Sequence, residues 1–128
     1  MRKTFTSSIL YALAISVTVF VWGCSETQDP VKVYNRGARA YNNGDYVKAI
    51  GMFKLALQTH REYSLPMIGL AKCYLHFARE DLQQGNKVAA RKDIEEAFYW
   101  ITQAINADPA NQVALETKQK ILKFRSEL

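Results

Sequence analysis

From residue 31 onward, apolar residues recur at intervals of three and four along the chain. This is the spacing of one face of an α-helix, whereas a half-buried β-strand requires strict alternation. The first such row consists of Tyr34, Gly37, Ala38 and Tyr41. Because no segment after residue 30 alternates convincingly, the sequence predicts an all-α fold.

Short polar breaks divide this pattern into five helical segments. Gly44-Asp45 forms the first break, because glycine suits the left-handed position after a helix and aspartate caps the first amides of the next one. The later breaks precede Ser64, fall at Gly85-Asn86 and span 108–111. Segments joined by loops this short are expected to pack antiparallel.

In the last helical segment, the predicted inward residues are Leu115, Ile121 and Leu122. Further upstream, Cys73 stands among apolar neighbours and is expected to be a small buried residue. A redox-active role for this thiol is the alternative.

The helical pattern repeats along the chain. Ala38-x-x-Tyr41 returns as Ala71-x-x-Tyr74, 33 residues later. A second set returns 48 residues later: Ala49, Phe53 and Ala56 recur as Ala97, Ile101 and Ala104. Repetition of helix pairs at such periods is typical of a solenoid.

These residues, together with Gly44-Asp45-Tyr46 and Asp108-Pro109, resemble the tetratricopeptide repeat (TPR) family, whose unit is a helix–turn–helix. The resemblance implies one repeat at 31–60, a second at 64–109 and a capping helix at 111–126. The second repeat has about 15 extra residues relative to the usual unit, which would lengthen its hairpin by roughly 10 Å. A helical hairpin bundle of no particular family is the alternative.

The first 23 residues have the character of a secretory signal. Arg2 and Lys3 precede an uncharged apolar run at 9–22. A helix that spans a bilayer needs about 20 apolar residues, whereas the core of a secretory signal has about 7–15. The run therefore fits a signal peptide better than a permanent span.

The run ends in Val21-Trp22-Gly23-Cys24, which resembles the bacterial lipobox. The resemblance implies that residues 1–23 are removed, that Cys24 carries a covalent lipid, and that 24–30 forms a lipidated polar tether. Two or three acyl chains hold a protein stably on a membrane. Ser25 follows the cysteine where an aspartate would favour the inner membrane, which implies the outer membrane, facing the periplasm, in a diderm source. An uncleaved signal anchor with an incidental Cys24 thiol is the alternative.

The formal net charge of +5 is no strong indication of nucleic-acid binding. Removal of Arg2 and Lys3 with the signal lowers the 17 basic residues to 15 against 12 acidic ones, a charge of +3. The C-terminal basic residues point in different directions around a helix; they are Lys118, Lys120, Lys123 and Arg125. We therefore expect the remaining basic residues to be dispersed and no nucleic acid to bind.

No catalytic or metal-binding motif is present. The sequence lacks a nucleophile elbow and a phosphate-binding loop, and its two histidines, His60 and His76, fall on different helical segments. Asp93 and Glu96 share a helix face but follow two basic residues, as in a solvated surface. We therefore expect that the protein is not an enzyme and that it binds no metal and no cofactor other than the covalent lipid.

A groove is the expected functional surface, because in the TPR family the inner helices of successive repeats line a concave groove that holds a partner segment. By register, the predicted groove residues are Tyr34, Arg39, Asn42, Lys72, His76 and Arg79. Arginine and lysine there would favour an acidic segment or a terminal carboxylate. The alternative is that these six are ordinary exposed residues. Tyr99 and Trp100 are further interface residues, unless Trp100 packs against the last helix.

The expected function is that of a non-catalytic, membrane-anchored interaction or assembly module of the bacterial cell envelope, with a protein or peptide partner. Two alternatives remain open. One is a structural role through self-association as a homodimer, since a short solenoid leaves apolar ends. The other is an enzyme in which the extended hairpin forms a lid.

Overall fold

The computed structural model describes residues 28–128, so the predicted signal peptide, the lipobox and Cys24 lie outside the described residues. Five α-helices follow one another: α1 (Pro30–Asn42), α2 (Tyr46–Thr59), α3 (Ser64–Gln83), α4 (Lys87–Ala107) and α5 (Gln112–Ser126). No strand occurs between residues 28 and 128. The predicted all-α class and all four breaks are confirmed.

The breaks work as the sequence indicates. Gly44 and Gly85 both adopt φ of 79°, a left-handed conformation that glycine tolerates without steric cost. The side chains of Asp45 and Asn86 then accept hydrogen bonds from backbone amides in the first turn of α2 and α4, each at 3.1 Å. Asn111 caps α5 in the same way, at 3.2 Å from the amide nitrogen of Ala114.

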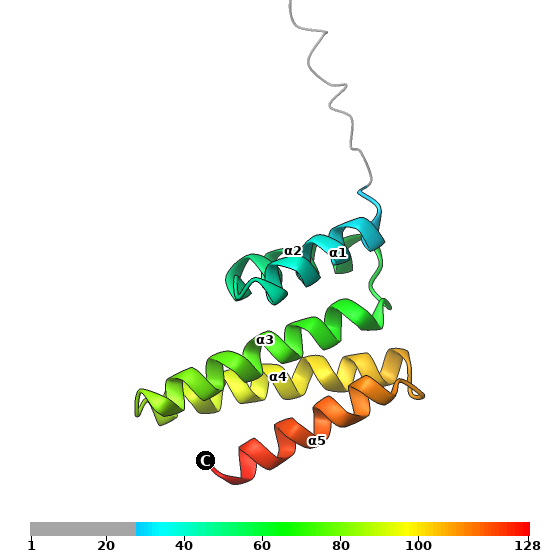
Figure 1. Ribbon diagram of the computed structural model, residues 1–128. Helices are drawn as coiled ribbons and strands as arrows, with labels where there is room; N and C mark the ends of the chain where they lie inside the picture. Colours follow the sequence, from blue (N-terminus) through cyan, green and yellow to red (C-terminus); the bar gives the residue numbers. More distant parts are fainter. Residues whose placement is uncertain (1–27) are drawn as a thin grey trace, which may run out of the picture.

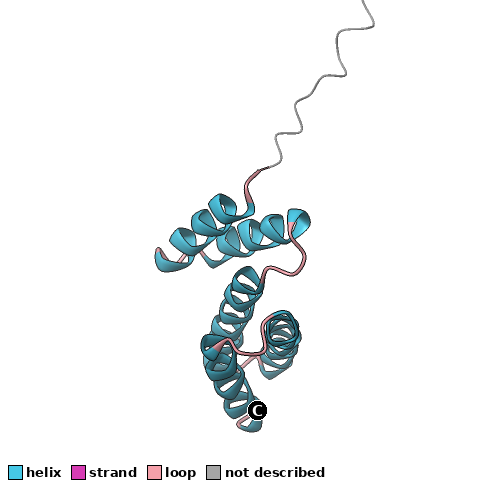
Figure 2. Cartoon of the chain, turned by 90° about the vertical axis from the view of Figure 1, so that its right-hand side faces the viewer, coloured by secondary structure: helices cyan, strands magenta, loops and turns pink. Residues whose placement is uncertain are grey.

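The helices form a stack of antiparallel hairpins, in which α1–α2 lies at one end, α3–α4 in the middle and α5 at the other end (Figure 1). Figure 2 shows the same layers from the side. With 20 and 21 residues, α3 and α4 are each seven residues longer than α1 and α2, which have 13 and 14. The predicted extension of the second hairpin is therefore present, shared equally between its two helices. Among the described helices, none combines the length and apolarity needed to cross a membrane.

Two apolar clusters hold the stack together, and all their members lie within this part of the chain. The smaller joins the first hairpin to α3 and is built from Ala40, Ala49, Phe53, Leu70 and Cys73. The larger joins α3, α4 and α5, with Ile94, Ile101 and Ile121 at its centre. Leu57, Tyr74 and Trp100 touch both clusters. The two clusters thus link all five helices through buried apolar contacts.

Phe53 lies where three helices meet. Its ring is 2% exposed and lies between Gly37 of α1 and Gly69 of α3. A Cβ atom would stand 2.7 Å from the ring at Gly37 and 2.5 Å from it at Gly69, closer than real Cβ contacts. The two glycines therefore let α1 and α3 approach the ring from opposite sides.

The buried faces of α1 and α5 differ in part from the apolar rows of the sequence, although Gly37 of the first row is buried and Ile121 is buried as predicted. On α1 the fully buried residues are Val33, Gly37 and Ala40, because this helix packs one face on α2 and turns the tyrosine row toward α3. On α5 they are Ala114, Thr117, Ile121 and Phe124. Leu115 and Leu122 remain 37% and 42% exposed, because small Ala114 and Thr117 allow close approach to the stack.

Candidate interaction groove

One concave surface of the stack is lined by α1, α3 and α5. It consists of three adjoining hollows, which we call together the groove. The first and second share Tyr41 and Lys72, and the second and third share Arg79 and Lys120. The groove therefore runs without interruption from the first hairpin to the end of α5.

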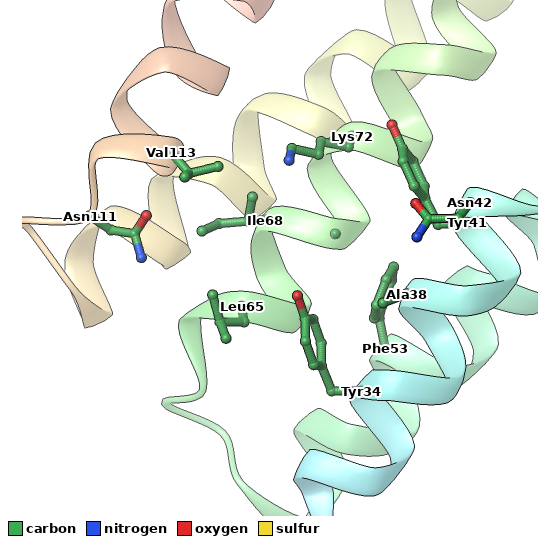
Figure 3. A pocket seen from close by; sticks show the side chains of 11 residues that line it. Tyr34, Ala38, Tyr41, Asn42, Phe53, Leu65, Ile68, Lys72, Asn111 and Val113 are labelled. Atoms are coloured by element: carbon green, nitrogen blue, oxygen red, sulfur yellow. The ribbon is translucent and has the colours of Figure 1, made fainter.

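The first hollow has a volume of about 380 Å³ and is mainly apolar. Its walls come from α1, α2, α3 and the start of α5: Tyr34, Ala38, Tyr41, Asn42, Phe53, Leu65, Ile68, Gly69, Lys72, Asn111 and Val113. Figure 3 shows the Lys72 amine and the Tyr34 hydroxyl beside this space, with Asn111 on the far wall. The hollow can accept an apolar side chain and offers polar groups at its rim.

The tyrosines of this hollow are held by aromatic packing. The ring of Tyr34 lies 5.8 Å from that of Phe53 and 5.6 Å from that of Tyr63, measured between centroids. Burial raises the pKa of the Tyr41 phenol, and nearby Cys73 and Tyr46 raise it further. Tyr41 therefore stays neutral at physiological pH and presents a hydroxyl that can donate a hydrogen bond.

The other two hollows carry positive charge. The second, of about 260 Å³, lies between Lys72, His76, Arg79 and Lys120. The third, of about 320 Å³, adds Lys123 and the acidic Glu127. Four side chains that are cationic at neutral pH thus line this half of the groove against one carboxylate.

His76 is fixed at the edge of the groove. Its Nε2 lies 3.2 Å from Oε1 of Glu80, one helical turn away. Its ring stacks on Tyr46 with centroids 3.9 Å apart. These contacts hold the His76 ring in one orientation at the surface of α3.

Five of the six predicted groove residues come together, and Arg39 does not. Tyr34, Asn42 and Lys72 line the first hollow, and Lys72, His76 and Arg79 the second. Arg39 lies on another side of α1, where its Nε donates to the carbonyl of Asn35 at 3.4 Å. It lines a separate hollow of about 520 Å³ with Arg36, Asn43, Asp45 and Lys48. The prediction failed because the helix turns this position away from the tyrosine row.

Sequence reasoning missed the contribution of α5. Thr117 and Lys120 line the groove, and Val113 closes the apolar end. Lys120 lies three residues after Thr117, so it could have been placed in the groove if Ala114, Thr117, Ile121 and Phe124 had been recognised as the buried row of α5. Of the four C-terminal basic residues, Lys120 and Lys123 line one hollow with Arg79, whereas Lys118 and Arg125 do not line the groove and Arg125 pairs with Glu95.

The structure offers little for catalysis. In residues 28–128, no three His, Cys, Asp or Glu side chains are grouped closely enough to hold a metal ion. Cys73 is fully buried, as predicted, and burial raises the pKa of its thiol to about 12. A thiol with that pKa supplies almost no thiolate at neutral pH, so it is a poor nucleophile.

The two aromatic residues of α4 differ in exposure. Tyr99 is 53% exposed, whereas Trp100 packs at the junction of both clusters with its Nε1 buried and without a hydrogen-bond partner. Tyr99 lies edge-on to Trp100, with centroids 5.1 Å apart. Of the pair, Tyr99 alone is available to a partner.

No model of a known protein family, no curated protein and no solved structure matches this chain.

Proposed function

We propose that the protein is a lipid-anchored, TPR-like interaction module of the bacterial cell envelope, without catalytic activity. The observation that carries the proposal is the continuous groove, which joins an apolar hollow to a cationic half. Such a surface fits an extended partner segment with one apolar side chain followed by carboxylates. Arginine and lysine bind carboxylates by charge-assisted hydrogen bonds.

The TPR assignment rests on the repeat spacing in the sequence and on the antiparallel hairpins. Gly37, Phe53 and Gly69 supply the close helix approach that small residues provide in this family. In this interpretation α5 is the capping helix. Its outer row, which includes Leu115 and Leu122, would meet the next helix in a longer array.

The anchor is proposed from the sequence alone. A lipid on Cys24 would hold the domain on the outer membrane, facing the periplasm, in a diderm source. Confinement to one surface would raise the effective concentration of the module for partners on the same membrane.

Metabolic labelling with a palmitate analogue tests the anchor. We expect the wild-type chain to be labelled and membrane-bound, and the Cys24→Ala variant to be unlabelled and released. Unchanged partitioning of Cys24→Ala into membranes would contradict the lipid anchor.

Chemical crosslinking in the native envelope followed by purification tests the groove. We expect the double variant Lys72→Gln/Arg79→Gln to lose specific partners that the wild type captures. The matched control is Lys87→Gln/Lys92→Gln, which removes two exposed cations at the start of α4 and should capture the same partners as the wild type. Equal capture by all three proteins would overturn the groove proposal.

Self-association is a second proposal, favoured by one observation. Leu115 and Leu122 lie seven residues apart on α5 and remain 37% and 42% exposed. Measurement of the molecular mass of residues 25–128 in solution separates a dimer from a monomeric module.

A further inference from the structure

The positive charge of the protein is concentrated in its first hairpin. Residues 28–59 contain five basic residues and two acidic residues, Asp29 and Asp45. Residues 60–128 contain ten basic and nine acidic residues, which nearly cancel. The excess charge of the folded part therefore belongs to α1 and α2.

Most of this charge shares one surface. Lys32, Arg36 and Arg39 are spaced by four and three residues, so they form a single exposed row on α1. Lys48 of α2 joins Arg36 and Arg39 around the separate hollow of about 520 Å³. We call these four residues the cationic face.

In the described structure, no side chain of the cationic face is held in an ion pair. Asp45 lines the same hollow and Asp29 precedes Lys32 by three residues, but neither carboxylate forms an ion pair with a member of the face. The face is therefore a row of one sign, whereas a terminal helix that only needs solubility carries mixed polar residues.

The cationic face and the groove lie on different sides of α1. At 100° per residue, the row of Lys32, Arg36 and Arg39 is roughly 150° around the helix from Tyr34, Ala38 and Tyr41. In Figure 1, α1 forms part of the outer layer of the stack, at the end where the described chain begins. A flat partner on the cationic face would leave the groove open.

The position of the cationic face, close in sequence to the predicted membrane anchor, indicates what kind of flat partner it binds. Only five residues lie between Cys24 and Pro30, where α1 begins, so six residue-to-residue steps join the two. At about 3.5 Å per residue, they span at most roughly 20 Å. A chain anchored at its apolar N-terminal segment would hold α1 within that distance of a bilayer surface.

We propose that the cationic face binds the anionic headgroups of a phospholipid bilayer and turns the groove away from it. Guanidinium and ammonium groups bind phosphate oxygens directly. The choice of a bilayer over other polyanions rests on the proposed membrane attachment, but the binding itself does not need the lipid on Cys24.

Vesicle flotation with residues 25–128 tests the proposal, since these residues include all five helices and both apolar clusters. We expect binding to phosphatidylcholine vesicles that contain about one third phosphatidylglycerol, and little binding to phosphatidylcholine alone. Each basic residue near an anionic surface raises partitioning about fivefold. The triple variant Arg36→Gln/Arg39→Gln/Lys48→Gln should therefore bind about 100-fold more weakly.

The control variant Lys87→Gln/Lys92→Gln/Lys118→Gln has the same net charge and should lose much less binding. Equal loss in both variants would overturn the proposal, because net charge alone would then explain the binding. Binding of a DNA duplex with no binding to the anionic vesicles would also overturn it. The groove uses other residues, so a failure here would leave partner capture in the native envelope unchanged.

Discussion

At the scale of single residues, the packing around Phe53 decides how closely the first hairpin approaches α3. Cβ atoms added at Gly37 and Gly69 would overlap the ring from two sides. Gly51, on the exposed side of α2, has no atom within 4 Å of the position of its added Cβ. Among the glycines inside the described helices, Gly37 and Gly69 are thus required by contact and Gly51 is not.

Gly69→Ala should destabilise the protein by about 1–3 kcal/mol, because overpacking against the Phe53 ring outweighs the better helix propensity of alanine. Gly51→Ala is the matched control and should stabilise it by about 0.5–1 kcal/mol. Urea denaturation measures both. A Gly69→Ala variant as stable as Gly51→Ala would show that the helices separate more easily than this packing implies.

Cys73 should be inert in the folded protein. A pKa of about 12, against the ordinary thiol value of 9.0, leaves about 1,000-fold less thiolate at pH 8. We expect residues 25–128 to react with a thiol reagent only after denaturation. Rapid labelling of the native protein would contradict this prediction and show that Cys73 is a reactive thiol.

At the scale of helices, the sequence predicts boundaries better than faces. Gly44-Asp45, Gly85-Asn86 and 108–111 carry local chemistry that acts within one turn, so all were found. The inward face depends on which neighbours the helix meets. On α5, the large apolar residues Leu115 and Leu122 led to the prediction of an inward face that includes them. The small residues Ala114 and Thr117 are the ones that are buried against the stack.

The extended hairpin of α3 and α4 contains two neighbouring carboxyl groups that repel each other when both are charged. Asp93 lies beside Asp81, and the pKa of Asp93 is raised by burial first and by the Asp81 carboxylate second. Since the folded state binds the Asp93 proton more tightly than the unfolded state, this residue lowers stability as pH rises through its native pKa.

Asp93→Asn should therefore stabilise the protein at pH 7 by about 0.5 kcal/mol, because a neutral amide avoids the repulsion. The gain should shrink as the pH falls through the raised pKa of Asp93 toward 3.8, the ordinary aspartate value, because folded wild-type Asp93 then becomes protonated and uncharged. Thermal unfolding of both proteins between pH 4 and pH 7 measures this, with exposed Glu62→Gln as the control. A gain that grows toward low pH would contradict the assigned cause.

At the scale of the whole molecule, the two proposed surfaces lie on different sides of the first hairpin. The groove faces α3 and α5, and the cationic face lies on the outer side of α1. Helical register and the repeat pattern were enough to place Tyr34, Asn42 and Lys72 together. The contribution of α5 to the groove depends on how this helix packs on α3, which the sequence pattern does not specify. Arg39 lies on the cationic face and not in the groove, because α1 contributes residues to both surfaces from different sides of the helix.

Site-specific photocrosslinking in the native envelope tests most directly whether the groove binds a partner. A photoreactive residue at Leu65, 38% exposed in the apolar hollow, is compared with one at Val88, 82% exposed at the start of α4. We predict a discrete crosslinked partner from position 65 and none from position 88. Absence of an adduct at 65, or the same adducts from both positions, would contradict the proposed interaction module.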